Sequence, residues 1–443
     1  FFWRNQFIKI MKKSIPGKEM YGWAQDLYPI CRSLTGPGVR ETLGYLKTLI
    51  PDLTLHEITS GSNVFDWQVP LEWEIKDAYI EDANGLKIID FQLNNLHLVG
   101  YSEPVDLTLD LEELQHHLHS IPAQPNAIPY ITSYYSRNWG FCLSHNQRKT
   151  LKNGKYHVVI DSELKNGVLN YADLVIKGES SQEVFLSTYI CHPSMGNNEL
   201  SGPIVSTALA KWVSLLEKPF YTYRFVFIPE TIGSLIYLSK NLDHMKNNVK
   251  AGFNISCIGD DRCYSFMPSR DGQTLSDRVG EHIVQAIDPA FKKYSWLHRG
   301  SDERQYCAPG IDLPIASIMR SKYGEYPEYH TSLDDLSFIS PAGLEGGLHA
   351  LIKSIEAIER NVFPKASILG EPQLGKRGLY HHTAKKQSTD TVRIIRDFLT
   401  YSDGQHDLID IANLINVPIW ELYEVMDDLR EHHLVETKRE KYE

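Results

Sequence analysis

Four polar segments of this 443-residue chain carry side chains that could perform chemistry, and each lies near an apolar run. The side chains that stand out are His192, Glu230, Asp302 and His330. Imidazole nitrogens and carboxylate oxygens gathered from separate strand ends suit Zn²⁺, which takes N and O ligands in tetrahedral geometry. A metal-bound water of near-neutral pKa, with a carboxylate base, hydrolyses amides without a covalent intermediate. Each segment alone has an ordinary structural interpretation, but their joint occurrence predicts a metal-dependent hydrolase.

The elements that must position these side chains alternate between strand and helix. Apolar runs at 183–190 and 223–229 each lead into a segment with helical spacing, and further apolar runs lie at 249–259 and 312–320. Such alternation predicts an α/β fold with a mostly parallel or mixed sheet and helices on both faces. The polar loops then fall at the carboxyl ends of the strands, where open α/β sheets bind ligands.

Other parts of the chain have a different pattern. Asn-Gly pairs at 84–85, 153–154 and 166–167 lie between β-rich runs and predict hairpins, with one helix near 107–120. The stretch 362–388 is rich in Pro, Gly and Lys, which is typical of a linker, and the order of elements beyond it predicts a winged helix. We therefore expect three units. They are an α/β core formed by 1–58 and 173–365, an inserted β-rich domain at 59–172, and a winged helix domain at 388–443.

Charge, hydropathy and cysteine content restrict the possible partners. A net charge of −11 argues against a nucleic-acid backbone as the partner. No apolar run approaches the roughly 20 residues of a membrane span, and the N-terminal segment lacks the order of a secretory signal. The six cysteines form no CxxC pair, which favours reduced thiols and a cytoplasmic location.

The predicted winged helix is acidic, with 6 Lys and Arg against 13 Asp and Glu between residues 388 and 443. Its expected recognition helix carries Glu421, Glu424, Asp427 and Asp428. DNA phosphates would repel these carboxylates. We therefore expect this domain to make protein contacts or a homo-oligomer, and a role as a DNA-binding regulator is disfavoured.

The order of the motifs resembles that of the zinc aminopeptidase and glutaminyl cyclase superfamily. His192 is followed by "ELSG" (199–202), "PETIGS" (229–234), "GSDE" (300–303) and "YHTSLDD" (329–335). More closely, segments such as "CRSLTGPGVRETL" make the chain similar to bacterial aminopeptidase-like proteins often labelled polysaccharide-biosynthesis-associated. The resemblance implies a zinc-exopeptidase-like mixed sheet with an inserted β domain of unknown function and a C-terminal winged helix.

Carried over by position, the resemblance implies that His192, Glu230 and His330 are metal ligands. Asn198 stands where the exopeptidases have a bridging aspartate, and Ser256 stands where a strand-end aspartate would bind a second metal. A neutral amide is a poorer Zn²⁺ ligand than a carboxylate. We therefore expect one zinc ion at most.

The identity of the general base stays open on these grounds. Glu199 could serve, or Glu230 could be the base while the histidines hold the metal, and Asp302 would orient a ligand or take part in proton transfer.

The leading hypothesis is a zinc-dependent aminopeptidase-like hydrolase that cuts an N-terminal peptide amide or an amino-sugar-linked amide. The alternative is a catalytically degenerate protein that holds a peptide or glycan conjugate. Further candidates for substrate contact are Arg320, Tyr329 and Tyr135.

Overall fold

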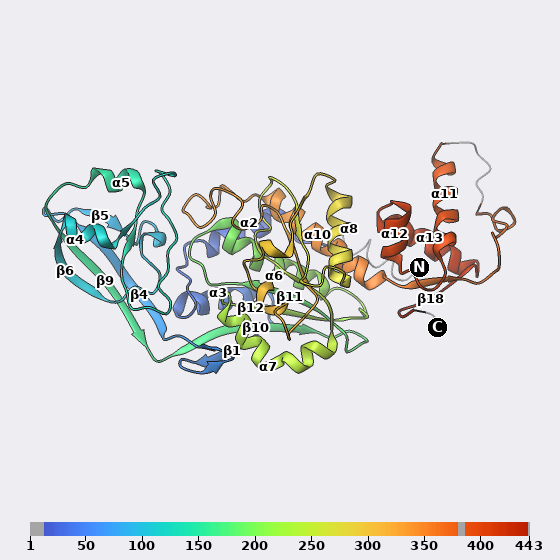
Figure 1. Ribbon diagram of the computed structural model, residues 1–443, viewed down its shortest axis with the longest axis horizontal. Helices are drawn as coiled ribbons and strands as arrows, with labels where there is room; N and C mark the ends of the chain where they lie inside the picture. Colours follow the sequence, from blue (N-terminus) through green and yellow to red (C-terminus); the bar gives the residue numbers. More distant parts are fainter. Residues whose placement is uncertain (1–12, 380–385, 442–443) are drawn as a thin grey trace.

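The computed structural model describes residues 13–379 and 386–441, and it shows an elongated molecule (Figure 1). A four-stranded sheet lies at one end, an eight-stranded sheet with its helices forms the middle, and a helical domain lies at the other end. No helix of the described ranges is long and apolar enough to cross a membrane. All six cysteines are free thiols, as expected.

The eight-stranded sheet is mixed, with parallel strands at its centre. Strands β12, β11, β13 and β16 run parallel, and antiparallel strands β10 and β14 flank them. All seven residues of β11 are buried, which is usual for a parallel strand that is covered on both faces. In sheet order the strands are β1 (Thr54–Thr59), β10 (Val168–Ile176), β12 (Thr222–Ile228), β11 (Glu183–Tyr189), β13 (Val249–Asn254), β16 (Ile315–Met319), β14 (Ser265–Met267) and β15 (Lys292–Lys293).

Helices cover both faces of this sheet and create two apolar cores. Along β11, Val184 and Leu186 enter one core while Phe185 between them enters the other. The alternation of side chains along a strand produces this division. The first core is completed by α2 (Gly17–Leu27), α3 (Pro37–Leu49), α6 (Ser201–Val213), α8 (Leu275–Ile287) and α10 (Pro341–Arg360), and the second by α7 (Ile232–Asn248) and α9 (Glu303–Tyr306). The predicted α/β class is confirmed.

The inserted region forms a separate antiparallel sheet. Its strand order is β5 (Lys87–Asp90), β4 (Glu72–Glu81), β9 (Lys155–Lys165) and β6 (Val105–Asp110). The helix predicted near 107–120 is confirmed only in part, because residues 105–110 pair with β9, whereas Leu111–Leu114 form α4 and Gln115–His117 form a 3₁₀ helix.

Only one of the three Asn-Gly pairs joins two neighbouring strands. Asn84-Gly85 connects β4 to β5 as predicted. Asn153-Gly154 follows helix α5 (His145–Thr150), and Asn166-Gly167 leads from β9 into β10, which belongs to the other sheet. A Cβ atom on Gly167 would lie 2.2 Å from Oε2 of Glu72, so close packing at the joint between the sheets explains this glycine.

A loop of the insertion returns to the core and lies over its strand ends. The backbone N–H of Tyr130 donates to the carbonyl of His330 at 2.8 Å, and Ser332 N–H donates to the carbonyl of Ile128 at 2.9 Å. An isolated bridge pairs Pro129 with Thr331. The insertion is therefore bound to the segment that carries a predicted metal ligand.

The C-terminal domain contains α11 (Lys386–Tyr401), α12 (Leu408–Ile415), α13 (Ile419–Glu431) and strand β18 (Val435–Lys438). The partner strand of β18 is β17 (Phe363–Ala366), which lies inside the stretch interpreted as a linker. Ion pairs attach this domain to the core. Arg278 of α8 binds Asp407 and Asp410 at 2.8 and 2.7 Å, and Arg360 of α10 binds Asp427 at 2.9 Å.

Replacement of Arg278 by alanine should weaken the attachment of the C-terminal domain. The side chain of Asp407 is only 2% exposed, so it would lose its charged partner with little access to water. We expect a loss of about 1.5–3 kcal/mol in the free energy of unfolding, measured by urea denaturation. Arg393→Ala, which breaks an exposed pair with Asp397 within α11, is the control and should cost less than about 0.5 kcal/mol. Equal losses in the two variants would contradict this account.

Candidate metal centre

His192 follows β11 directly and has one ring nitrogen anchored. Its Nδ1 lies 2.9 Å from Oε2 of Glu199, while Nε2 lies 3.7 Å from Oε2 of Glu230. Burial lowers the pKa of His192 to about 3, and the charge of Arg32 acts in the same direction. The imidazole is therefore neutral. With its proton on Nδ1 and donated to Glu199, Nε2 keeps a lone pair directed toward Glu230.

Glu199 and Arg32 form a buried ion pair behind this histidine. Arg32 Nε lies 3.4 Å from Glu199 Oε1, and neither side chain has any exposed surface. The guanidinium also donates to the carbonyls of His192 and Leu27 at 2.9 and 2.8 Å. Burial raises the pKa of Glu199, whereas the charge of Arg32 and the contact with His192 lower it and favour the ionised carboxylate of the pair. Water has no access to the Glu199 carboxylate.

Asn198 lies in a π-helical turn, Gly196–Leu200, that Asp334 holds in place. The Asp334 carboxylate accepts the backbone N–H groups of Asn197 and Asn198 at 2.6 and 2.9 Å. The hydroxyl of Tyr189 lies 2.7 Å from the carbonyl oxygen of Asn198 and 2.9 Å from its Oδ1, so its single proton is shared between these two acceptors. The side chain that replaces the bridging carboxylate is therefore fixed by protein contacts.

Glu230 and Asp302 are neighbouring carboxylates on different loops. The side chain of Glu230 is 21% exposed, whereas Asp302 is fully buried. Burial and then the charge of Asp302 raise the pKa of Glu230 to about 8, and burial raises the pKa of Asp302 to about 7. Oδ1 of Asp302 accepts the Thr231 N–H at 2.7 Å and the Ser234 hydroxyl at 2.8 Å, while Oδ2 has no hydrogen-bond partner within 13–379 and 386–441.

The loop that carries Glu230 is strained and held by these contacts. Thr231 has a φ of 66°, which an L side chain rarely adopts. Its hydroxyl accepts a hydrogen bond from Arg304 at 2.6 Å, and its N–H is bound by Asp302. Asp302 therefore holds the loop that carries Glu230, and its charge raises the pKa of Glu230.

His330 meets His192 inside an aromatic enclosure. The ring of Tyr329 stacks on His330 at 3.9 Å between centroids, and the Tyr130 ring lies edge-on at 5.1 Å. The centroids of the His192 and His330 rings are 5.4 Å apart. Burial lowers the pKa of His330 to about 3, and its buried Nε2 has no hydrogen-bond partner among the residues that the structure describes. A neutral imidazole with an unsatisfied nitrogen is therefore present beside His192.

A second cluster of metal-ligating groups lies deeper. Cys191, His192 and Glu199 have ligand atoms within 4.8 Å of one another, the only such group of three in the described parts of the chain. The Cys191 sulfur accepts the backbone N–H of Glu230 at 3.2 Å, and burial keeps its thiol pKa well above the ordinary value. Because Arg32 already supplies a positive charge to Glu199, this cluster is poorly suited to a cation.

The three candidates for substrate contact lie in different places. Tyr329 lines the centre through its stack on His330. Arg320 packs over the ring of Tyr264 at 4.0 Å, next to α10. Tyr135 is 54% exposed and lies in the inserted region, where its hydroxyl donates to the carbonyl of Gln68 at 3.2 Å.

Sequence reasoning missed Arg32, Tyr130 and Asp334 as parts of the centre. Arg32 lies in "CRSLTGPG" and Asp334 in "YHTSLDD", two segments on which the family resemblance rests. Within them, no spacing to another residue indicated a role for either side chain. Tyr130 comes from the insertion, and only the folded structure brings it against His192, at 5.2 Å between ring centroids.

Comparison with known sequences decides the family. Residues 21–361 match the sequence model of a domain of unknown function, DUF4910, and residues 361–437 match a winged helix-turn-helix family. The chain belongs to the DUF4910 family. A Clostridium acetobutylicum relative, provisionally named a polysaccharide biosynthesis protein with an aminopeptidase-like domain, is 43% identical over 405 residues, which are 91% of this chain and 92% of the relative.

Solved structures confirm the fold of this DUF4910 protein. A candidate peptidase from C. acetobutylicum is 40% identical with a TM-score of 0.89, covering 99% of this chain and 98% of that one. A zinc aminopeptidase from Bacillus subtilis is 12% identical with a TM-score of 0.56, covering 77% and 94%. An aminopeptidase from Aneurinibacillus sp. strain AM-1 is 14% identical with a TM-score of 0.51, covering 79% and 95%. The predicted resemblance and the winged helix are thereby confirmed.

Replacement of Arg32 by alanine should strongly destabilise the DUF4910 core. The change leaves the Glu199 carboxylate buried without its cation and opens a cavity, because both side chains are fully buried. We expect the free energy of unfolding to fall by about 3–5 kcal/mol, measured by chemical denaturation. Lys293→Ala, which removes an exposed pair with Glu281, should cost no more than about 1 kcal/mol. A cost below 1 kcal/mol for Arg32→Ala would show that the pair does not organise the site.

Proposed function

We propose that the protein is a single-metal hydrolase of the aminopeptidase type, with His192, His330 and Glu230 as the metal ligands. The observation that carries the proposal is the unsatisfied Nε2 of His330, buried beside a second neutral imidazole. Two histidines and one glutamate are a known ligand set of catalytic zinc with an open position. The 3.7 Å between His192 Nε2 and Glu230 Oε2 is compatible with two ligands of one small cation. The ligand atoms of His330 do not lie within 4.8 Å of both, so His330 would have to move toward them to complete the set.

A zinc ion held there would polarise an amide carbonyl and make bound water more acidic. The residues of the chain supply the rest. Glu199 positions His192 through Nδ1, in the manner of carboxylates that support metal-bound histidines. Because Glu199 is paired with Arg32 and its other oxygen holds His192 Nδ1, it is not proposed as the base.

Asp302 is the carboxylate best placed to accept a proton. Its Oδ1 is occupied by Thr231 and Ser234, so only Oδ2 is free, and its charge already acts on Glu230. A pKa raised to about 7 is close to the value that favours general base catalysis at neutral pH. The proposed substrate is an amide of an N-terminal residue or of an amino sugar, in line with the name of the C. acetobutylicum relative.

The winged helix is proposed to make protein contacts, including self-association. Asp427 of α13 is paired with Arg360 of the core, and the Arg360 guanidinium packs over the Tyr423 ring at 4.1 Å. One face of the expected recognition helix is thus already occupied, and its remaining acidic residues do not suit DNA.

The metal assignment and the base assignment can be separated by variants. The wild-type chain, reloaded with zinc after chelation, should hold about one equivalent by elemental analysis and hydrolyse aminoacyl p-nitroanilides. His330→Ala and Glu230→Gln should lose the zinc, whereas Asp302→Asn should keep it and lose at least about 100-fold in kcat. His298→Ala, at an exposed histidine, is the control and should change neither property. Zinc binding without any hydrolysis would instead support the alternative of a degenerate binding protein. The absence of zinc from the reloaded wild-type chain would refute the assignments of the metal ligands and of the base.

Replacement of Asn198 by aspartate should raise the metal capacity of the site. The shapes of the two side chains are alike, and the Tyr189 hydroxyl can still donate to Oδ1, so the fold should persist. The added carboxylate should bring the zinc content from about one toward two equivalents. Asn84→Asp, in an exposed turn, is the matched control. An unchanged zinc content would show that the site is not a reduced form of a two-metal site.

A further inference from the structure

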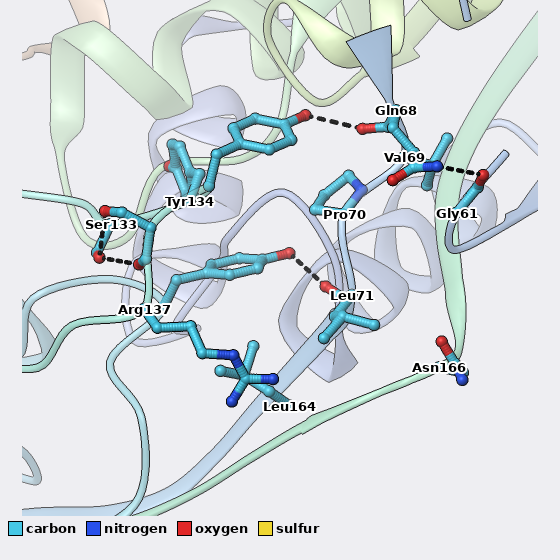
Figure 2. Close-up of a pocket in the computed structure, with 13 residues that line it drawn as sticks. Gly61, Gln68, Val69, Pro70, Leu71, Ser133, Tyr134, Arg137, Leu164 and Asn166 are labelled. Carbon is cyan, nitrogen blue, oxygen red and sulfur yellow. Dashed lines mark hydrogen bonds between the residues drawn. The ribbon is translucent and has the colours of Figure 1, made fainter. Parts of the chain in front are cut away.

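A cavity of about 390 Å³ lies within the inserted region, between the loop 133–137 and the hairpin of β2 (Asn63–Val64) and β3 (Trp67–Gln68) (Figure 2). Figure 2 shows Tyr134 and Arg137 on one side and the Gln68–Leu71 segment on the other. Small-molecule sites commonly enclose about 300–1,000 Å³. The cavity is large enough to hold a compact ligand.

The exposed ring of Tyr135 lines this cavity, and it is held by contacts with Gln68 and with Trp67, which lies outside the lining. Tyr135 is 54% exposed and Trp67 is 41% exposed, and their rings meet edge to face at 5.7 Å. The Tyr135 hydroxyl is fixed by the carbonyl of Gln68 at 3.2 Å. Clustered apolar surface of this kind marks a binding site, and flat rings in fixed positions suit ligands that have one C–H-rich face and a polar edge, as sugars do.

The polar lining favours a neutral ligand. Arg137 Nη1 is paired with Glu103 Oε1 at 2.9 Å, so its charge is already compensated, and no other lining residue is charged. The side-chain amide of Asn166 faces the cavity and makes no hydrogen bond to any other described residue. An amide offers both donors and an acceptor, which match hydroxyl and acetamido groups.

The backbone around the cavity does not suit a peptide strand. Gly61 N–H donates to the carbonyl of Val69 at 2.8 Å, and Val69 N–H donates to the carbonyl of Ser62 at 2.9 Å. These backbone groups are therefore used within the hairpin and are not available to an extended peptide.

One wall of the cavity is shared with the metal centre. The hydroxyls of Tyr134 and Tyr130 are 2.7 Å apart, and the Tyr130 ring lies edge-on to His192 at 5.2 Å and to His330 at 5.1 Å. A group bound in the cavity is thus separated from the centre by two tyrosine side chains. We propose that this cavity is a binding subsite for a neutral N-acetylated sugar, which adjoins the part of the substrate whose amide the proposed hydrolase would cut. Only the link to cleavage rests on the proposed function, since binding needs no metal.

The test is calorimetric titration of the full chain, freed of metal by a chelator, with N-acetylglucosamine and N,N′-diacetylchitobiose. We expect saturable binding that Tyr135→Ala weakens at least about tenfold, or about 1.4 kcal/mol, and that Asn166→Ala also weakens. Tyr135→Phe keeps the ring and should keep most of the affinity. Leu93→Ala, at an 84% exposed residue away from the cavity lining, is the control and should bind as the wild type does.

Two outcomes would overturn the inference. The first is the absence of saccharide binding. The second is that inorganic phosphate or trialanine binds in place of the sugars and that Tyr135→Ala loses this binding. Sugar binding by a protein that fails to hydrolyse amides would refute the proposed function alone. Amide hydrolysis without sugar binding would refute the subsite alone.

Discussion

The buried ion pair between Arg32 and Glu199 is the interaction on which the metal centre depends. Both side chains are fully buried, so each needs the other to offset the cost of leaving water. Glu199 fixes the orientation of the His192 ring by binding Nδ1, and Arg32 fixes the His192 backbone by donating to its carbonyl. The result is a histidine whose free nitrogen can point only toward Glu230. Arg32 also places a fixed positive charge behind the site, which favours one added cation over two.

The inserted region and the C-terminal domain attach to the α/β core by different physical means. The insertion reaches it by backbone hydrogen bonds and by Tyr130, which packs against both histidines. The C-terminal domain stays on the far side of the core, attached by ion pairs from α8 and α10. The aromatic cavity lies on the insertion side. Substrate recognition is therefore expected from the insertion rather than from the winged helix.

Much of the fold could be predicted from the sequence because the signals were local. Strand-then-helix alternation indicated the mixed sheet, and its loops carry His192, Glu230 and Asp302. The errors arose where long-range packing decides the structure. Asn166-Gly167 has a hairpin sequence, yet close contact with Glu72 and the change of sheet determine its conformation. Strand β17 could not be recognised because its partner β18 lies about 70 residues later in the chain.

The metal centre, too, could be predicted only where its residues have a local sequence signal. His192 and His330 follow from motif order, but the partner of Glu199 is Arg32, far away in sequence and marked by no spacing. The central claim is a single metal held by His192, Glu230 and His330, and anomalous diffraction at the zinc edge from zinc-soaked crystals tests it most directly. The account predicts one peak within bonding distance of His192 Nε2, His330 Nε2 and the Glu230 carboxylate. Two peaks, or a single peak among Cys191, His192 and Glu199, would contradict it.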